Sequence, residues 1–77
     1  MISPERRAEF IALIVAELEN AYQKHGAAEW NRHEFYGVLK EEVDELWDAI
    51  KRNDPEDELV IEAAQVAAMC IRYVETT

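Results

Sequence analysis

Hydrophobic residues recur at every third or fourth position along most of this 77-residue chain, which is the spacing of one face of an α-helix. The first run begins after Ser3-Pro4, where Ser suits an N-cap and Pro suits the first helical position. It stops at His25-Gly26, so the pattern predicts a helix over residues 4–24. Its apolar positions are Phe10, Ile11, Ile14, Leu18 and Tyr22.

Two further runs predict a second helix from about residue 32 to 52 and a third over residues 55–75. Asn31 is the expected N-cap of the second helix. Pro55 disfavours a helical residue in front of it but suits a first helical position, so we expect Asp54 to cap the third. No alternation typical of β-strands is present, and the predicted fold class is all-α.

The third predicted helix is apolar around much of its circumference, which calls for neighbours on more than one side. A core built from 77 residues also contributes only about 3–5 kcal/mol of net stability. We therefore expect one domain over residues 1–77, a three-helix chain that forms a helical bundle with a partner subunit, and a dimer through residues 55–75. The apolar positions of this helix are Leu59, Val60, Ile61, Val66, Met69, Ile71 and Val74.

Composition limits the compartment and the partners. The single cysteine, Cys70, lies in an apolar run and is expected to pack as a small hydrophobe, and the N-terminus does not resemble a secretory signal. No apolar run approaches the roughly 20 residues that span a bilayer, so we expect a reduced, cytoplasmic protein that does not bind membranes. The net charge of −9 argues against a nucleic-acid polymer as partner but allows phosphate compounds that bring a divalent metal.

Acidic residues crowd the segment "LKEEVDELW" inside the second predicted helix. At about 100° per residue, Glu42 lies in the middle of the apolar stripe, with Glu45 about 60° and Glu41 about 100° to one side of it. Asp44 points nearly the opposite way and is expected to be solvated. On the third predicted helix, Glu62 is likewise centred on the apolar face.

Carboxylates that face one another in a core cost several kcal/mol each unless they are protonated, paired with cations or bound to a metal. Glu62 is followed one turn later by Gln65, which adds another oxygen. A hard divalent cation suits such ligands, Mg²⁺ by preference and Mn²⁺ as a substitute. Half-buried acids paired with Arg or water are the alternative that the residues leave open.

The segments "KEEVDELWDAI" and "IEAAQVAAMCIRYVE" resemble the MazG-like all-α nucleoside triphosphate pyrophosphohydrolases, in particular small phage-associated and bacterial MazG-like proteins. The family pattern is E-E-x-x-E, a spacer and E-x-x-D on consecutive helices. Residues 41–45 match its first half, and residues 62–65 match the second half except at the last position, Gln65. The resemblance covers about residues 33–75.

This resemblance implies Mg²⁺-dependent hydrolysis of an NTP or dNTP between its α and β phosphates, in homodimers or homotetramers. By position, Glu42, Glu45 and Glu62 would be metal ligands, and Glu41 would be a ligand or the catalytic acid that orients the attacking water. Gln65 stands where the family has Asp; its carbonyl oxygen still suits a metal but brings no charge. It therefore leaves a second function open, a non-catalytic helical dimer that binds metal or nucleotide in a regulatory role.

Three basic residues are candidates for binding phosphate oxygens, namely Lys24, Lys40 and Arg72. For Arg72 a salt bridge to Glu41 or Glu45 is an equally good interpretation.

Three aromatic residues, Trp30, Tyr36 and Trp47, could stack on a base, although aromatics more often serve cores and interfaces. His25 is expected to cap the first helix, and His33 points away from Glu42, so both histidines stay outside the predicted site.

Overall fold

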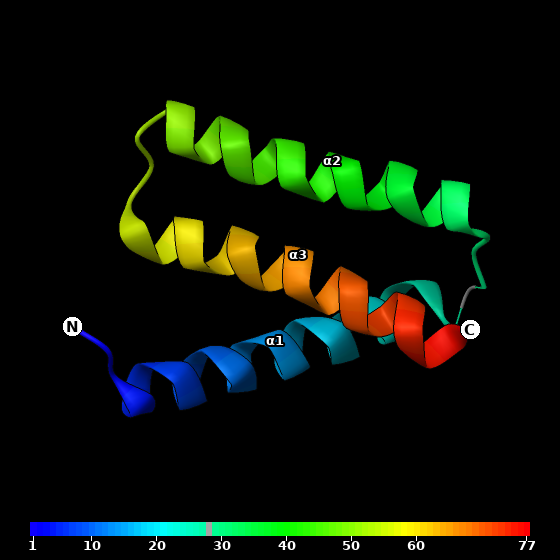
Figure 1. Ribbon diagram of the computed structural model, residues 1–77, viewed down its shortest axis with the longest axis horizontal. Helices are drawn as coiled ribbons and strands as arrows, with labels where there is room; N and C mark the ends of the chain where they lie inside the picture. Colours follow the sequence, from blue (N-terminus) through cyan, green and yellow to red (C-terminus); the bar gives the residue numbers. More distant parts are fainter. Residues whose placement is uncertain (28) are drawn as a thin grey trace.

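The computed structural model describes residues 1–27 and 29–77, which form three helices: α1 (Pro4–His25), α2 (Arg32–Lys51) and α3 (Glu56–Thr76) (Figure 1). Each predicted helix is present with its ends within a residue or so of the expected ones, and the described residues contain no strand. The all-α prediction is confirmed for this part of the chain. The predicted connection between the first two helices contains Ala28, which lies outside the described residues.

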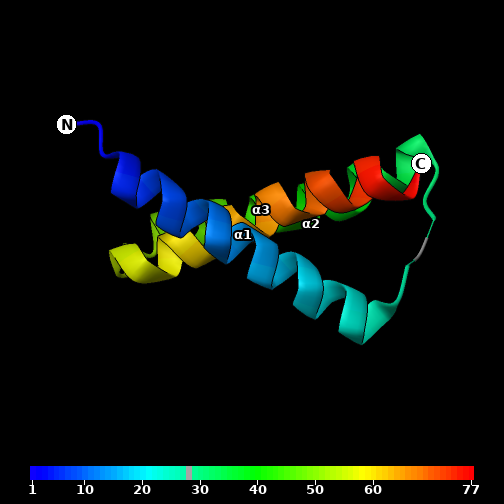
Figure 2. The same ribbon diagram turned by 90° about the horizontal axis from the view of Figure 1, so that it is seen from below.

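Helix α3 lies between the other two helices and packs against both (Figures 1 and 2). Within the described residues α1 and α2 do not pack against each other. Helices α2 and α3 run antiparallel side by side, whereas α1 crosses α3 obliquely (Figure 2). The buried hydrophobic residues include Leu18 on α1, Ala49 on α2, and Ala64, Ala68 and Met69 on α3. The two alanines of α3 are small and let the neighbouring helices come close to it.

Two of the predicted N-caps are confirmed. The Ser3 hydroxyl accepts a hydrogen bond from the backbone N–H of Arg6 at 3.1 Å, and Pro4 is the first residue of α1. Asn31 and Glu34 form a reciprocal capping box at the start of α2, with distances of 2.9 and 3.0 Å. Each cap satisfies backbone donors that have no partner inside the helix.

The predicted caps at Asp54 and His25 are wrong. Pro55 has an extended backbone and is itself the N-cap residue of α3, while the carboxylate of Asp54 accepts two hydrogen bonds from Arg52 instead of capping. At the end of α1, Gly26 is the C-cap with φ at 66°, a conformation that glycine adopts without steric cost, and His25 is the last helical residue.

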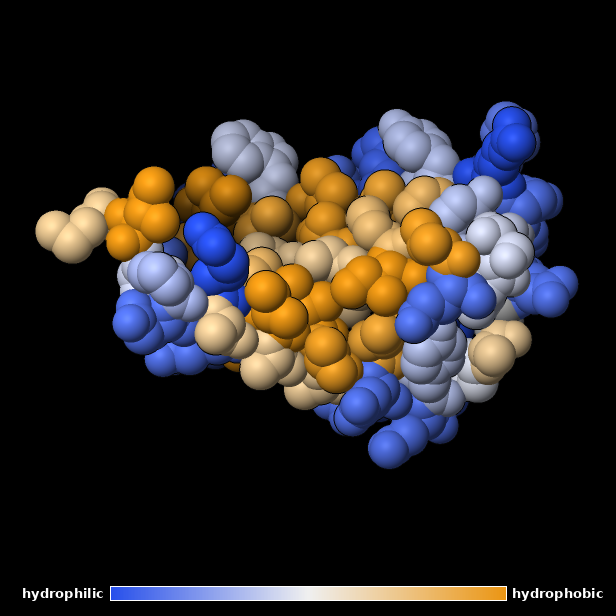
Figure 3. All heavy atoms as spheres, turned by 60° about the horizontal axis from the view of Figure 1, so that its bottom comes forward, coloured by the Kyte–Doolittle hydropathy of each residue, from blue (hydrophilic) through white to orange (hydrophobic). Residues whose placement is uncertain are grey.

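The neighbours that α3 requires are supplied by α1 and α2 of the same chain, so dimerisation through residues 55–75 stays a prediction. A broad hydrophobic patch nevertheless remains on the surface, over α1 and α3 and reaching α2 (Figure 3). None of the helices in residues 1–27 and 29–77 combines the length and the hydrophobicity needed to cross a membrane.

Candidate metal centre and cleft

Three carboxylates from two helices converge on one point. Glu42 and Glu45 lie one turn apart on α2, and Glu62 faces them from the second turn of α3. One oxygen of each group lies within 4.8 Å of the others. The antiparallel pairing of α2 and α3 thus brings together the acids that the two apolar stripes predict.

Two oxygens of this cluster, Oε2 of Glu42 and Oε2 of Glu62, are buried and have no hydrogen-bond partner among the described residues. Burial, and then the negative charges of Glu45 and Glu62, raise the pKa of Glu42. Burial and the charge of Glu45 raise the pKa of Glu62, against the opposing effect of Arg52. Both carboxyls therefore favour a proton or a cation at this point.

The cluster offers carboxylate oxygens, which are the ligands that hard divalent cations take. Oxygens bind Mg²⁺ at about 2.0–2.1 Å, so neighbouring ligands lie about 3 Å apart and opposite ligands about 4 Å apart. The oxygens of the cluster lie within 4.8 Å of one another, a limit somewhat larger than these values, so the three side chains would have to draw closer to bind Mg²⁺.

The predicted alternative, in which the half-buried acids of the cluster pair with Arg, is not found among the described residues. Among the described residues, no Lys or Arg makes a salt bridge to Glu42, Glu45 or Glu62. Arg52 acts on Glu62 only through its charge, because its guanidinium is hydrogen-bonded to Asp54.

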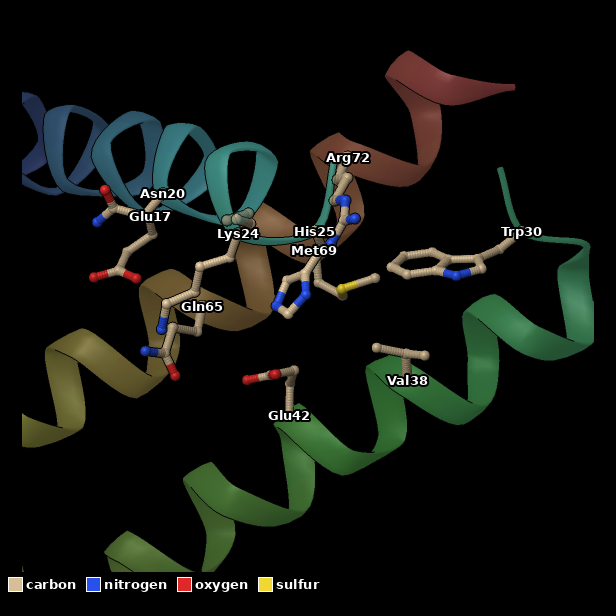
Figure 4. A pocket seen from close by; sticks show the side chains of 12 residues that line it. Glu17, Asn20, Lys24, His25, Trp30, Val38, Glu42, Gln65, Met69 and Arg72 are labelled. Carbon is tan, nitrogen blue, oxygen red and sulfur yellow. The ribbon is translucent and has the colours of Figure 1, made fainter. Parts of the chain in front are cut away.

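A cavity of about 550 Å³ adjoins Glu42, with walls from α1 and α2 and with α3 beneath them (Figure 4). Gln65 and Lys24 both line this cleft (Figure 4). Glu41 is exposed and adds to the negative charge that raises the pKa of Glu42. Glu42 is thus the member of the acidic cluster that lines the cleft, together with Glu17 of α1, and the cleft volume lies in the range of small-molecule sites.

The cleft brings some predicted substrate-binding residues together and leaves one aside. Lys24 and Trp30 line it, as does Arg72. Lys40 does not; it is exposed and pairs with Asp44 at 2.9 Å. Asp44 is exposed, in agreement with its predicted solvation.

Arg72 is engaged by the protein itself. It is only 4% exposed, donates a hydrogen bond to the carbonyl oxygen of Gly26 at 3.0 Å, and makes no salt bridge to Glu41 or Glu45. Its guanidinium lies 4.6 Å from the centre of the Trp30 ring and 5.7 Å from that of Tyr22. Its described contacts therefore join α3 to the end of α1 and to Trp30.

His25 lines the cleft, so the prediction that it lies outside the site is wrong (Figure 4). The spacing along the sequence indicates this position, because His25 lies seven residues after Leu18 and four after Ala21, which places all three on one face of α1.

Compared with models of protein families, with curated proteins and with solved structures, the chain matches none of them. The likeness to MazG-like proteins therefore rests on the acidic motifs of α2 and α3.

Proposed function

We propose that this chain is a Mg²⁺-dependent nucleotide pyrophosphohydrolase that cleaves an NTP or dNTP to the monophosphate and pyrophosphate. The observation that carries the proposal is the convergence of Glu42, Glu45 and Glu62 in one cluster, of which Glu42 lines the cleft. Buried carboxylate oxygens without a partner favour a cation there, and a metal-bound triphosphate is a ligand that brings one.

Each residue has a role in this scheme. Glu42, Glu45 and Glu62 hold the ion, which when bound neutralises phosphate charge and makes water a better nucleophile. Gln65 offers a neutral oxygen on the same flank, and Glu41 accepts a hydrogen bond that orients the water.

The rest of the cleft suits the remainder of a nucleotide. Lys24 and His25 line the same cleft as Glu42, and their nitrogen donors can bind phosphate oxygens. Trp30 lines the same cleft and offers a ring for base stacking, with the Arg72 guanidinium against that ring. Contact of Arg72 itself with phosphate remains a prediction.

A pyrophosphate-release assay over a panel of NTPs and dNTPs with Mg²⁺ tests the proposal. We expect turnover of at least one nucleotide, and Glu42→Gln should lower it by at least about 100-fold, because loss of a ligand costs more than loss of an outer-shell contact. Glu19→Gln, an exposed change on α1, is the matched control and should retain activity. Absence of turnover with every nucleotide, or equal activity in both variants, would contradict the proposal.

Gln65 favours a second candidate, a non-catalytic protein that binds metal or nucleotide in a regulatory role. A neutral ligand in place of a carboxylate weakens binding of a divalent ion. In this case calorimetry would detect Mg²⁺ or nucleotide binding to a protein that releases no pyrophosphate. Gln65→Asp should then raise the affinity for Mg²⁺, and a gain of turnover would identify position 65 as limiting.

A further inference from the structure

Glu17 is a carboxylate of the cleft that the proposed function does not use. Among the described residues, two carboxylates line the cleft, Glu17 from α1 and Glu42 from α2. Glu42 belongs to the acidic cluster, whereas Glu17 does not. Glu17 is half-buried, and no Lys or Arg in the described part of the chain makes a salt bridge to it. A titratable side chain of this kind in a cleft is a candidate for acid–base chemistry.

Contacts between α2 and α3 show which of their residues lie at the same level of the cleft. The rings of Phe35 and Tyr73 are stacked, with their centroids 4.0 Å apart. Because the two helices run antiparallel, a position seven residues further along α2 lies level with one seven residues back along α3 (Figure 1). Those positions are Glu42 and Val66, and Gln65 directly precedes Val66.

Contacts between α1 and α3 place Glu17 at this level too. The two helices run in the same general direction, and the Arg72 guanidinium lies 5.7 Å from the centre of the Tyr22 ring (Figures 1 and 2). One to two turns back from this contact lie Glu17 on α1 and Gln65 on α3, and both line the cleft. Each helix therefore brings one oxygen-bearing side chain to the same end of the cleft, with Glu17 on the α1 wall facing the α2 wall that carries Glu42.

The hydrolysis that we propose needs an acceptor for a proton. Attack of water on the α-phosphorus releases a proton, which a carboxylate within hydrogen-bond reach of that water can take. In the proposed function the oxygens of Glu42, Glu45 and Glu62 hold the ion, so they are poorly suited to accept it. Glu41 is exposed and does not line the cleft, so its hydrogen bond can orient the water only from outside. Glu17 is the carboxylate that remains.

The position of Glu17 suits this role. In-line attack places the water on the side of the phosphorus opposite the leaving oxygen. A triphosphate held from the α2 wall can therefore present its α-phosphorus and the water towards α1. The next residue, Leu18, is buried, which anchors this turn of α1 and holds the Glu17 backbone in place.

We infer that Glu17 is the general base of this reaction, an inference that rests on the proposed function. The Glu17 carboxylate takes one proton from the water as the water oxygen forms a bond to the α-phosphorus. The bond between the α-phosphorus and the oxygen that bridges to the β-phosphorus breaks, and its electron pair leaves with pyrophosphate. Because Glu17 is only half-buried, it can then return the proton to solvent.

Steady-state kinetics of Glu17→Gln test the inference. Gln keeps the size of the side chain and an accepting oxygen but takes no proton, so kcat should fall by about 100-fold or more. The KM for nucleotide should change little. Calorimetry should show unchanged Mg²⁺ affinity, because Glu17 does not hold the ion. Glu19→Gln, an exposed change two residues further along α1, is the matched control and should keep the wild-type kcat.

Chemical rescue separates a base from a structural residue. Glu17→Ala removes the carboxylate and leaves space for a small acid at the same end of the cleft. Added formate should therefore raise the kcat of Glu17→Ala. It should not raise that of wild type or of Glu17→Gln, whose side chains fill the space.

The outcomes separate this inference from the function on which it rests. An active wild type with an equally active Glu17→Gln would overturn the inference and leave the proposed function standing. Loss of Mg²⁺ affinity in Glu17→Gln would make Glu17 a metal ligand, and failure of formate to rescue Glu17→Ala would make it a structural residue, so either result would overturn the inference as well. A wild type that turns over no nucleotide would overturn both proposals.

Discussion

Glu42 occupies a position in α2 where an apolar residue would contribute more to folding. It lies in the stripe that faces α3, and one of its oxygens is buried without a partner. Burial and the neighbouring carboxylates raise its pKa, so the folded chain holds a proton there more readily than the unfolded chain does. Such a residue destabilises the metal-free protein at neutral pH.

The raised pKa predicts the sign of a pH effect. The contribution of Glu42 to stability is fully present below the ordinary glutamate pKa of about 4.3 and is lost as pH rises through the raised value. Without metal, Glu42→Gln should therefore be more stable than wild type at neutral pH but have no advantage in acid. Urea unfolding at several pH values measures this, and Glu19→Gln should follow wild type throughout.

Metal should reverse this destabilisation. At ten times its dissociation constant, Mg²⁺ would stabilise the folded chain by about 1.4 kcal/mol, which corresponds to a rise in Tm of roughly 5–10 °C for a domain of this size. Thermal unfolding with and without Mg²⁺ or Mn²⁺ measures the shift, and chelator should abolish it. A shift that Glu42→Gln leaves unchanged would place the metal elsewhere.

The helices themselves show which features are local. Their lengths could be predicted because a hydrophobic period of 3.6 residues shows in any short segment of the sequence. Ser3 and Asn31 could be recognised as caps because a cap contacts only the next few residues. Asp54 could not be excluded as a cap in this way. Its choice of partner depended on Arg52, which competes for the same carboxylate.

The stability lost on replacing Asn31 can be compared directly with that lost on replacing Asp54. Asn31→Ala should lower stability by about 1 kcal/mol, within a range of 0.5–2, because the hydrogen bond from the Glu34 backbone N–H to the Asn31 side chain is lost. Asp54→Ala removes only a partly exposed salt bridge and should cost less. Chemical unfolding of the two variants measures the difference, and an equal or larger loss for Asp54→Ala would contradict the assignment of the caps.

At the scale of the whole molecule, Arg72 connects parts that are distant in sequence. It lies 46 residues from its acceptor Gly26 and contacts rings from α1 and from the connection that follows it. Among the described residues its cationic head has no salt-bridge partner, and its Nε is buried without a hydrogen bond, so the bond to Gly26 and the two rings replace only part of its hydration.

Removal of Arg72 should therefore be costly. A hydrogen bond from a charged donor and stacking on Trp30 together predict a loss of about 2–4 kcal/mol for Arg72→Ala. Arg72→Lys should recover only part of it, because an ammonium cannot stack as a planar guanidinium does. Unfolding followed by Trp fluorescence measures both, with exposed Arg52→Lys as the control that should change little.

The sequence by itself determined the three helices, two of their caps and the placement of Glu42 and Glu62 on the apolar stripes of their helices, because each follows from helical period or from contacts over a few residues. The meeting of these acids depended on the packing of α2 against α3. Only the tertiary structure decided that α1 crosses α3 so as to form a cleft with Lys24 and His25 in its wall. It also decided which hydrophobic residues stay exposed together on the surface. The angle between helices depends on how side chains of distant segments interlock, and no local pattern along the chain encodes that fit.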